Sequence, residues 1–394
     1  MINLIKELGF SRKNDSETLD DFKRVISSCI RDGYRKTIND VEIINIEKWK
    51  SGSKSTIYRL PIRIHFPSGK DLSDYLLKKY HNPFDKRIIS ERRISAISNE
   101  IPLQKYDFAM GREIKVFPKL FFDNDHSLLE KGISFMKEEE KPMLNEKLKE
   151  KNQISWELTA SKALEPLILL SDFLFTFAKY DLHIEDPFKI QGIPNPDAAY
   201  FTCKFEKSIE KIFDNKKIEI NFDKLSPRFY EIASKYLSCE ENNPQQNKTF
   251  VQEQAYPSHN NLFSLIDAGE VIIGSRLLSF GSLYGDEELE SKLDKKNEEL
   301  IKSVYNGYML RREELHSHEK HLSPFYIGEN EFATGFSLAA AYSNILRSAE
   351  YLKKQIAGFE NKSDNYLLNG ISHLEKIINF DIGTHEDKKK VYEM

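Results

Sequence analysis

The chain has 394 residues, and its 58 lysines and arginines against 62 aspartates and glutamates leave a formal net charge of −4. A hydrophobic fraction of 40% supports a sizeable core and excludes global disorder, and the near balance of charge argues against a generic nucleic-acid binder. Three scattered cysteines exclude a disulfide framework, and no apolar run is long enough for a transmembrane helix. The N-terminal residues lack the apolar segment of a signal peptide. We therefore expect a soluble, cytoplasmic protein with neither a nucleic-acid nor a membrane partner.

Residues 1–40 are predicted to form an N-terminal helical extension. Ser16 and Thr18 are residue types that cap a helix N-terminus. Apolar residues then recur at spacings of three or four, which indicates one buried helical face: Leu19, Phe22, Val25, Ile26 and Cys29.

Residues 41–136 are predicted to form a β-rich lobe. Three segments have the character of strands and are separated by polar turns: VEIINIEKW, TIYRLPIRIHF and LSDYLLKKY. Pro61 lies inside the second segment, so we expect an edge strand or a bulge there. Residues 85–101 are predicted to form a helix that Pro102 ends. REIKVFPKLFF and HSLLEKG are predicted as two further strands around a turn at 123–125.

The rest of the chain is predicted to be mostly helical. Residues 137–153 are highly charged and indicate a solvated linker, and residues 154–394 are expected to form a helical lobe. Within the apolar segment 155–182, Pro166 either kinks a helix or marks its start. A β-hairpin is expected at 262–274, with the turn Asp-Ala-Gly-Glu between LFSLI and VIIG. The fold class is therefore α+β, with a small antiparallel lobe followed by a helical one.

This order of elements resembles the protein-kinase-like fold, in particular the small-molecule kinases of the aminoglycoside phosphotransferase and choline kinase family. The resemblance covers roughly residues 40–380 and rests on the element order and a few local motifs. It implies a bilobal protein that binds ATP and Mg²⁺ between its lobes and, if active, transfers phosphate to a hydroxyl group of a small molecule.

The resemblance gives nucleotide-binding roles to two groups of residues in the β-rich lobe. The turn with Ser51, Gly52 and Ser53 stands where the family covers the ATP phosphates, and a short flexible turn exposes backbone N–H groups to them. Lys78, or its neighbour Lys79, follows an apolar strand and stands at the family's phosphate-contacting lysine.

Two further roles follow from the same resemblance. Glu91, or Glu100 as the alternative, would pair with the phosphate-contacting lysine and keep it charged and in place. Glu130 lies in the segment whose backbone is expected to hold the adenine.

The segment 251–288 is expected to carry the catalytic chemistry, but it departs from the family's pattern. Gln252, Glu253 and Gln254 stand where the family has His-Gly-Asp with its catalytic aspartate. Glutamine cannot accept a proton, so of the catalytic candidates Glu253 and Gln254 only the first is a possible base.

The expected metal ligands depart from the pattern as well. Asn260 or Asn261 stands near the family's metal-binding asparagine, and Ser275 or Gly274 falls where its metal-binding aspartate should be. Asp267 is the remaining carboxylate candidate for a metal, and hard cations such as Mg²⁺ prefer anionic oxygens. Two interpretations therefore stay open: a kinase that transfers phosphate, or a catalytically inactive pseudokinase that acts as a binding or regulatory scaffold.

Overall fold

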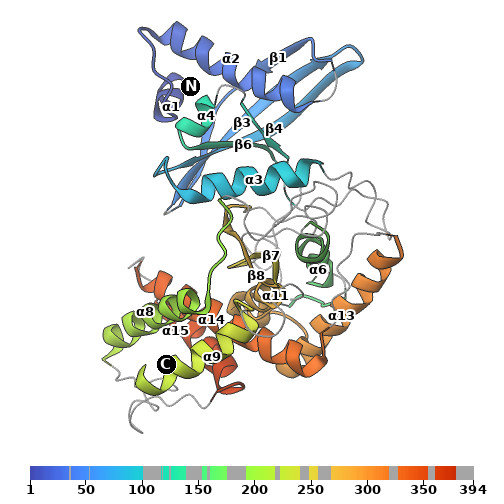
Figure 1. Cartoon of the computed structure of the whole chain (residues 1–394). Helices are drawn as coiled ribbons and strands as arrows, with labels where there is room; N and C mark the ends of the chain where they lie inside the picture. The colour runs from blue at the N-terminus through green and yellow to red at the C-terminus, as the bar shows by residue number, and fades with distance from the viewer. Residues whose placement is uncertain are drawn as a thin grey trace. The chain divides into compact units, whose positions relative to one another are not determined.

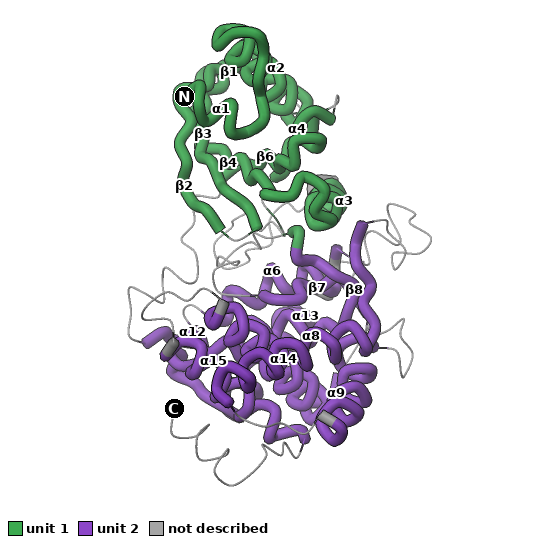
Figure 2. Tube along the Cα trace, turned by 90° about the vertical axis from the view of Figure 1, so that its left-hand side faces the viewer, with its two compact units in different colours: residues 1–102, 117–140, 267–269 green, residues 103–116, 141–266, 270–394 purple. Residues whose placement is uncertain are grey.

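The computed structural model describes residues 1–34, 37–52, 54–100, 117, 119–123, 126–138, 153–157, 160–174, 192–217, 222–239, 248–255, 268–318, 327–353 and 360–378. The chain divides into two compact units, which Figure 2 shows in green and purple. Unit 1 contains residues 1–102, 117–140 and 267–269, and unit 2 contains the others. Each unit has a hydrophobic core of its own.

Unit 1 is built on an antiparallel sheet (Figure 1). Within the described residues, its strands are β1 (Asp40–Ile43), β2 (Glu47–Ser51), β3 (Ser55–Phe66), β4 (Gly69–Tyr80), β5 (Leu120–Phe121) and β6 (Ile133–Lys137). Their order is β1-β3-β4-β6-β5, and β2 also pairs with β3. Along β3 and much of β4, buried side chains alternate with more exposed ones, because successive strand residues point to opposite faces. The antiparallel pairing confirms the predicted β-rich lobe, and the first predicted strand, VEIINIEKW, is divided into β1 and β2.

Pro61 lies in the middle of β3, which is a central strand, so the expected edge strand is wrong. The expected bulge is absent from the pairing of β3 with β4, whose register runs through Pro61 without a shift. On one side of β3 the partner strand changes at this point, because β1 pairs with Ile62 and later residues while β2 pairs with Arg59 and earlier ones. The carbonyl of Pro61 still accepts a hydrogen bond from the N–H of Ile44 at 3.0 Å. A residue without an N–H is tolerated where the partner strand changes, since fewer ladder bonds are lost there.

Two N-terminal helices, α1 (Ile2–Glu7) and α2 (Asp15–Gly33), pack on one face of this sheet. The apolar stripe of α2 is buried as predicted, and it shares a core with alternate residues of β3 and β4. The helix start differs from the prediction, because Asn14 caps α2 by accepting a hydrogen bond from the N–H of Glu17 at 2.8 Å. Thr18 lies one turn inside the helix, where its hydroxyl donates to the carbonyl of Asn14. Ser16 and Thr18 are therefore first-turn residues and not caps.

The region after the helix α3 (Lys86–Glu100) corrects a second prediction. HSLLEKG does not form a strand, because Ser127–Glu130 is the short helix α4. Asp123 accepts a hydrogen bond from the N–H of Leu128 at 2.6 Å, which supports this helical turn. The strand comes later, as β6, whose residues are buried on both faces apart from the last. Residues 139–152 of the predicted linker lie outside the described residues.

Unit 2 is mostly helical. Its described helices are η1 (Ala160–Ala163), α6 (Leu164–Ile168), η2 (Leu169–Leu174), α8 (Ala198–Lys216), α9 (Phe222–Tyr236), α11 (Arg276–Tyr284), α12 (Glu287–Glu290), α13 (Asn297–His318), α14 (Glu329–Lys353) and α15 (Glu360–Glu375); η4 (Ala268–Glu270) spans the boundary of the units. α14 packs against α8, α9, α11, α13 and α15. Gly281 lets α11 approach α14 closely, since a Cβ there would collide with Phe336 and Ala339. None of the described helices is both long and apolar enough to cross a bilayer.

Two predictions for unit 2 can be compared with the structure: the role of Pro166 and the hairpin at 262–274. Pro166 lies in the first turn of α6, where a helix N–H has no intrahelical partner, so it marks the helix start and not a kink. The strand predicted at VIIG is β8 (Val271–Ser275), and its partner is β7 (Lys248–Gln252). Residues 262–267, the other half of the predicted hairpin, lie outside the described residues.

The junction of α12 and α15 contains a buried carboxylate. Asp286 is 2% exposed, and its Oδ1 accepts hydrogen bonds from the N–H of Glu288 and the hydroxyl of Tyr366, each at 3.1 Å. Burial raises the pKa of Asp286 to about 7, and the charge of Glu288 adds to this rise while Arg347 and Tyr366 oppose it. This folded-state pKa is above the unfolded value of 3.8, so the native state binds the proton more tightly.

The unfolding free energy should therefore fall as the pH rises from about 4 to about 7, and by up to about 4 kcal/mol. Asp286→Asn keeps an acceptor oxygen and removes the charge, so we expect a flatter pH profile and a more stable protein at pH 8. Urea denaturation at pH 5 and pH 8 measures both effects. Asp223→Asn makes the same chemical change at an exposed site of α9 and should leave the profile unchanged. A variant Asp286→Asn with the wild-type slope would contradict the assignment.

Candidate functional site

The candidate site of unit 1 is centred on a buried ion pair. Lys78 on β4 places its Nζ 3.2 Å from Oε1 of Glu91 on α3. The two side chains are 12% and 1% exposed, so the charges meet largely out of water, where their attraction is strong. The structure thus brings together Lys78 and the first of the two acids named from the sequence. The alternative acid, Glu100, has a side chain outside the described residues.

The other oxygen of the Glu91 carboxylate, Oε2, accepts hydrogen bonds from two neutral donors. The hydroxyl of Tyr80 donates to Oε2 at 3.1 Å, and the hydroxyl of Ser134 donates to the same atom. Tyr80 is two residues after Lys78 on β4, and Ser134 is the register partner of Lys78 on β6. A carboxylate with three donors is fixed in orientation, and it fixes Lys78 in turn. Tyr80 could have been inferred from the sequence, because residues two apart in a strand lie on the same face. No pattern in the neighbouring residues indicates that Ser134 contacts Glu91.

The turn at residues 51–55, between β2 and β3, is tight. The N–H of Gly52 donates to the carbonyl of Ser55 at 2.8 Å, and the hydroxyls of Ser51 and Thr56 lie 3.1 Å apart. A Cβ on Gly52 would meet only the carbonyl oxygen of Ser55, at 3.6 Å, so the turn itself does not require a glycine. Such a glycine leaves room for a ligand to approach the backbone. Ser53 lies outside the described residues.

Lys78 shares its face of the sheet with apolar side chains. Ile57 of β3 is the register partner of Lys78, and Leu76 of β4 is the partner of Met136 on β6. Directly opposed residues, and residues two apart in a strand, lie on the same face. We call this side the Lys78 face, and it is the side opposite to the core with α1 and α2.

Trp49 marks a β-bulge at the start of this turn. The pairing of β2 with β3 shifts between Lys48 and Lys50, so Trp49 is the extra residue. Trp49 is 42% exposed, and the centre of its ring lies 4.6 Å from Nζ of Lys50 and 5.9 Å from Cζ of Arg59. Because a bulge re-aims the side chain of the extra residue, the ring is presented beside the turn. The lone aromatic residue in EKWKS is a signal that sequence reasoning missed.

Glu130 lies at the end of α4, three residues before β6. Its N–H donates to the carbonyl of His126 at 3.0 Å, and the N–H of Gly132 donates to the carbonyl of Leu129 at 2.9 Å. The backbone of this segment is thus engaged in a helical turn. The role of Glu130 in holding an adenine stays a prediction.

In unit 2, Glu253 is the residue directly after β7, and it is only 4% exposed. Lys204 Nζ and the hydroxyl of Tyr342 each lie 2.7 Å from Oε1, and the hydroxyl of Tyr200 lies 3.0 Å from Oε2. A carboxylate that balances a lysine and accepts two phenol hydroxyls is anchored to α8 and α14, as expected for a structural group. Gln254, the next residue, is half-buried, and its catalytic role stays a prediction.

The two positions at which a metal-binding aspartate was expected have packing and capping roles. A Cβ on Gly274 would lie 3.3 Å from the carbonyl oxygen of Leu237 and 3.3 Å from a methyl group of Val251, so a larger side chain has little room. Ser275 is the N-cap of α11, and its hydroxyl accepts a hydrogen bond from the N–H of Leu277 at 3.3 Å.

The three metal ligands predicted from the sequence, Asn260, Asn261 and Asp267, lie outside the described residues. In the part of the chain that the structure describes, no three histidine, cysteine, aspartate or glutamate side chains gather closely enough to hold a metal ion. Mg²⁺ is bound through carboxylate and phosphate oxygens. The binding of this metal by Asn260, Asn261 and Asp267 stays a prediction.

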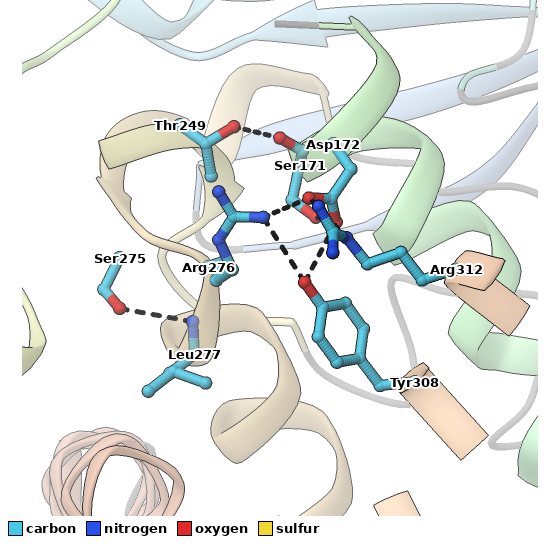
Figure 3. Close-up of polar contacts among 8 residues, drawn as sticks. All are labelled: Ser171, Asp172, Thr249, Ser275, Arg276, Leu277, Tyr308 and Arg312. Atoms are coloured by element: carbon cyan, nitrogen blue, oxygen red, sulfur yellow. Dashed lines mark hydrogen bonds and ion pairs between the residues drawn. The ribbon is translucent and has the colours of Figure 1, made fainter. Parts of the chain in front are cut away.

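A buried charged network lies directly after Ser275 (Figure 3). Asp172 on η2 is 0% exposed, and it accepts hydrogen bonds from Arg276 at the start of α11 and from Nε of Arg312 on α13, the latter at 3.3 Å. The hydroxyl of Tyr308 lies 3.4 Å from Oδ2 of Asp172 and 3.3 Å from Nη1 of Arg276. All four side chains are buried, so the network clamps three elements of unit 2 together and does not form a binding surface.

Comparison with known proteins finds likeness in structure and not in sequence. No family model matches the chain, and no curated protein matches it in sequence. A protein of Ralstonia eutropha JMP134 assigned to the aminoglycoside phosphotransferases is 10% identical, with a TM-score of 0.51 over 92% of this chain and 98% of that one. Choline kinase of Cryptosporidium parvum Iowa II is 10% identical, with a TM-score of 0.50 over 86% of this chain and 90% of that one.

The chain has the protein-kinase-like fold. The resemblance inferred from the order of elements is thereby confirmed, with an antiparallel sheet in the N-terminal unit and helices in the rest. At 10% identity this likeness establishes the fold alone.

The network around Asp172 gives a stability prediction. Asp172→Asn removes the negative charge that Arg276 and Arg312 face in a dry environment, so the unfolding free energy should fall by about 3–5 kcal/mol. Urea denaturation followed by circular dichroism measures the loss. Asp364→Asn, which removes the partly exposed ion pair with Lys216, is the matched control and should cost about 1 kcal/mol or less. Equal losses in the two variants would show that the network does not clamp unit 2.

Proposed function

We propose that this protein is a cytoplasmic binder of ATP or a related nucleotide, with Lys78 and the 51–55 turn contacting the phosphates. The observation that carries the proposal is the ion pair of Lys78 with the buried Glu91, beside a turn with an exposed glycine. Polyphosphates are bound by a placed cation together with backbone N–H groups. Since the N–H of Gly52 donates to Ser55, such donors would have to come from other residues of the turn. The net charge of −4 offers no general attraction for phosphate, so a few placed groups have to supply it.

The Lys78 face also has groups suited to a nucleobase. Ile57 and Leu76 are half-buried on this face and adjoin Lys78 in the sheet register, so an apolar surface lies next to the cation. Trp49 presents a partly exposed ring beside the 51–55 turn. A base is planar and apolar on its faces, so apolar and aromatic side chains next to a phosphate-binding group favour a nucleotide over inorganic phosphate.

We propose further that nucleotide binding is not followed by phosphotransfer through Glu253, which makes the protein a pseudokinase. Phosphoryl transfer needs a carboxylate that can orient the acceptor hydroxyl. Glu253 already balances Lys204 and accepts from two tyrosines. Ser275, at an expected metal position, caps a helix. Glu253 and Ser275 are therefore engaged in contacts that stabilise the fold.

The second candidate is phosphotransfer from ATP to a hydroxyl group of a small molecule, with Mg²⁺ on the phosphates. The likeness in fold to choline kinase favours it. Asn260, Asn261 and Asp267 would then be the residues that hold the metal.

The binding proposal predicts a strong effect of one lysine. Lys78→Met keeps the apolar stem and removes the charge, so ATP affinity measured by isothermal titration calorimetry should fall about 10-fold or more, as expected for a lost charge-assisted contact. Lys70→Met makes the same change at the exposed start of β4 and should bind as the wild type does. Gly52→Ala, whose Cβ the turn can accommodate, should also weaken binding if the phosphates approach the backbone there.

The two tryptophans of the chain locate the binding event. Trp49 is partly exposed beside the turn, whereas Trp156 is 6% exposed and packs against Tyr284 in unit 2. ATP should therefore change the fluorescence of a Trp156→Phe protein and leave that of a Trp49→Phe protein unchanged. Binding that persists in Lys78→Met with wild-type affinity would sink the proposed site.

Catalysis is tested by turnover with and without Mg²⁺. We expect no ATP consumption above background with choline, ethanolamine or an aminoglycoside as acceptor, because Glu253 is committed to Lys204 and the two tyrosines. Phosphorylated acceptor, detected by mass spectrometry and lost in Glu253→Gln, would establish the second candidate instead. Circular dichroism of Glu253→Gln checks that the variant is folded.

A further inference from the structure

The last residue of α1, Glu7, contacts three strands of unit 1. Its carboxylate accepts a hydrogen bond from the hydroxyl of Tyr58 on β3 at 3.0 Å and lies 3.6 Å from Nζ of Lys48 on β2. Its backbone carbonyl accepts a hydrogen bond from Nζ of Lys79 on β4. One residue of the N-terminal helix is thus tied to β2, β3 and β4.

The strand partners of Glu7 are direct neighbours of the candidate nucleotide site. Lys79 follows Lys78 on β4, and Tyr58 follows Ile57 on β3. Since consecutive strand residues point to opposite faces, Tyr58 and Lys79 lie on the side of α1 and α2, whereas Ile57 and Lys78 lie on the Lys78 face. Glu7 therefore contacts the strands of the candidate site from the face of the sheet opposite to Lys78.

The helix that carries Glu7 is firmly anchored. Ile5 and Leu8, on either side of Glu7, are 0% exposed. Phe10 is 1% exposed and packs edge-on against Phe22 of α2, with ring centres 5.2 Å apart. The apolar contacts hold α1 on the sheet, so the side chain of Glu7 meets the strands at a defined place.

The contact with Tyr58 is the one that matters most. The pair of Glu7 with Lys48 is half-exposed on both sides and contributes little. Tyr58 is 3% exposed, so its hydroxyl has little access to water and depends on the Glu7 carboxylate as acceptor. Burial and the neighbouring carboxylate raise the pKa of Tyr58 to about 12, so it stays a neutral donor at physiological pH.

We propose that Glu7 is a positioning residue for the nucleotide site: through Tyr58 it holds β3, and with it the 51–55 turn, in place relative to Lys78. The inference rests on the proposed function, because the site that Glu7 positions is the proposed nucleotide site. It gives the N-terminal helix a part in binding although the helix lies on the opposite face of the sheet.

The affinity arm of the test uses side-chain variants of the full chain. Glu7→Ala removes the acceptor but leaves the carbonyl bond of Lys79 and favours the helix, so ATP affinity should fall about fivefold. Glu7→Gln keeps an acceptor oxygen and should bind nearly as the wild type does. Tyr58→Phe should lower ATP affinity as much as Glu7→Ala does. The double variant Glu7→Ala/Tyr58→Phe should bind ATP no more weakly than either single variant. Asp15→Ala breaks the exposed pair with Lys6, which does not involve the sheet, and is the control.

The second arm needs no nucleotide and so separates this inference from the proposed function. Amide hydrogen exchange of the ligand-free protein should become faster in β3 and the 51–55 turn of Glu7→Ala, and not in α2. If the wild type fails to bind ATP, the proposed function is wrong, and this arm still decides whether Glu7 holds β3. Exchange that rises equally across unit 1, or an affinity that Glu7→Ala and Glu7→Gln lower alike, would show a general stabilising role and overturn the inference.

Discussion

The arrangement of unit 1 depends on the cost of burying the carboxylate of Glu91. An ion that is 1% exposed has lost its water and must be compensated by charges and donors of the protein. Lys78, Tyr80 and Ser134 supply this compensation, and they meet Glu91 only in the observed register of β4 and β6. A slip of one residue in β4 would turn Lys78 to the opposite face. The ion pair and the sheet register therefore support each other.

In unit 2, the described residues at the expected catalytic and metal positions make contacts within the kinase-like fold. The pair of β7 and β8 and the helices around α14 supply the kinase-like scaffold, which depends on apolar packing. Among the described residues at the expected catalytic and metal positions, Glu253 is hydrogen-bonded to two helices and Ser275 caps a third. Apolar packing depends on shape and burial, whereas phosphoryl transfer depends on carboxylates at defined points.

Much of the candidate site of unit 1 could be predicted because its signals are local. The apolar pair before Lys78, the glycine in a polar turn and the acid in the following helix are each visible within a few residues. Of the missed features, one depends on how distant strands meet, and the other two depend on which nearby side chain accepts a backbone N–H. Pro61 is tolerated in a central strand because β1 gives way to β2 beside it, and α4 replaces a predicted strand because Asp123 accepts the N–H of Leu128. Asn14, and not Ser16 or Thr18, caps α2 because the helix begins at Asp15.

The sequence by itself determined the α+β class and most of the order of the elements, because hydrophobic periodicity and charge are properties of neighbouring residues. The resemblance in element order then offered Lys78 or Lys79 as the lysine and Glu91 or Glu100 as its acid. Only the tertiary structure decided which polar groups meet. Ser134 on Glu91, Tyr58 on Glu7 and Lys204 on Glu253 join residues 43, 51 and 49 positions apart. Such contacts become strong only where folding removes water, and no local pattern encodes which residues will share that burial.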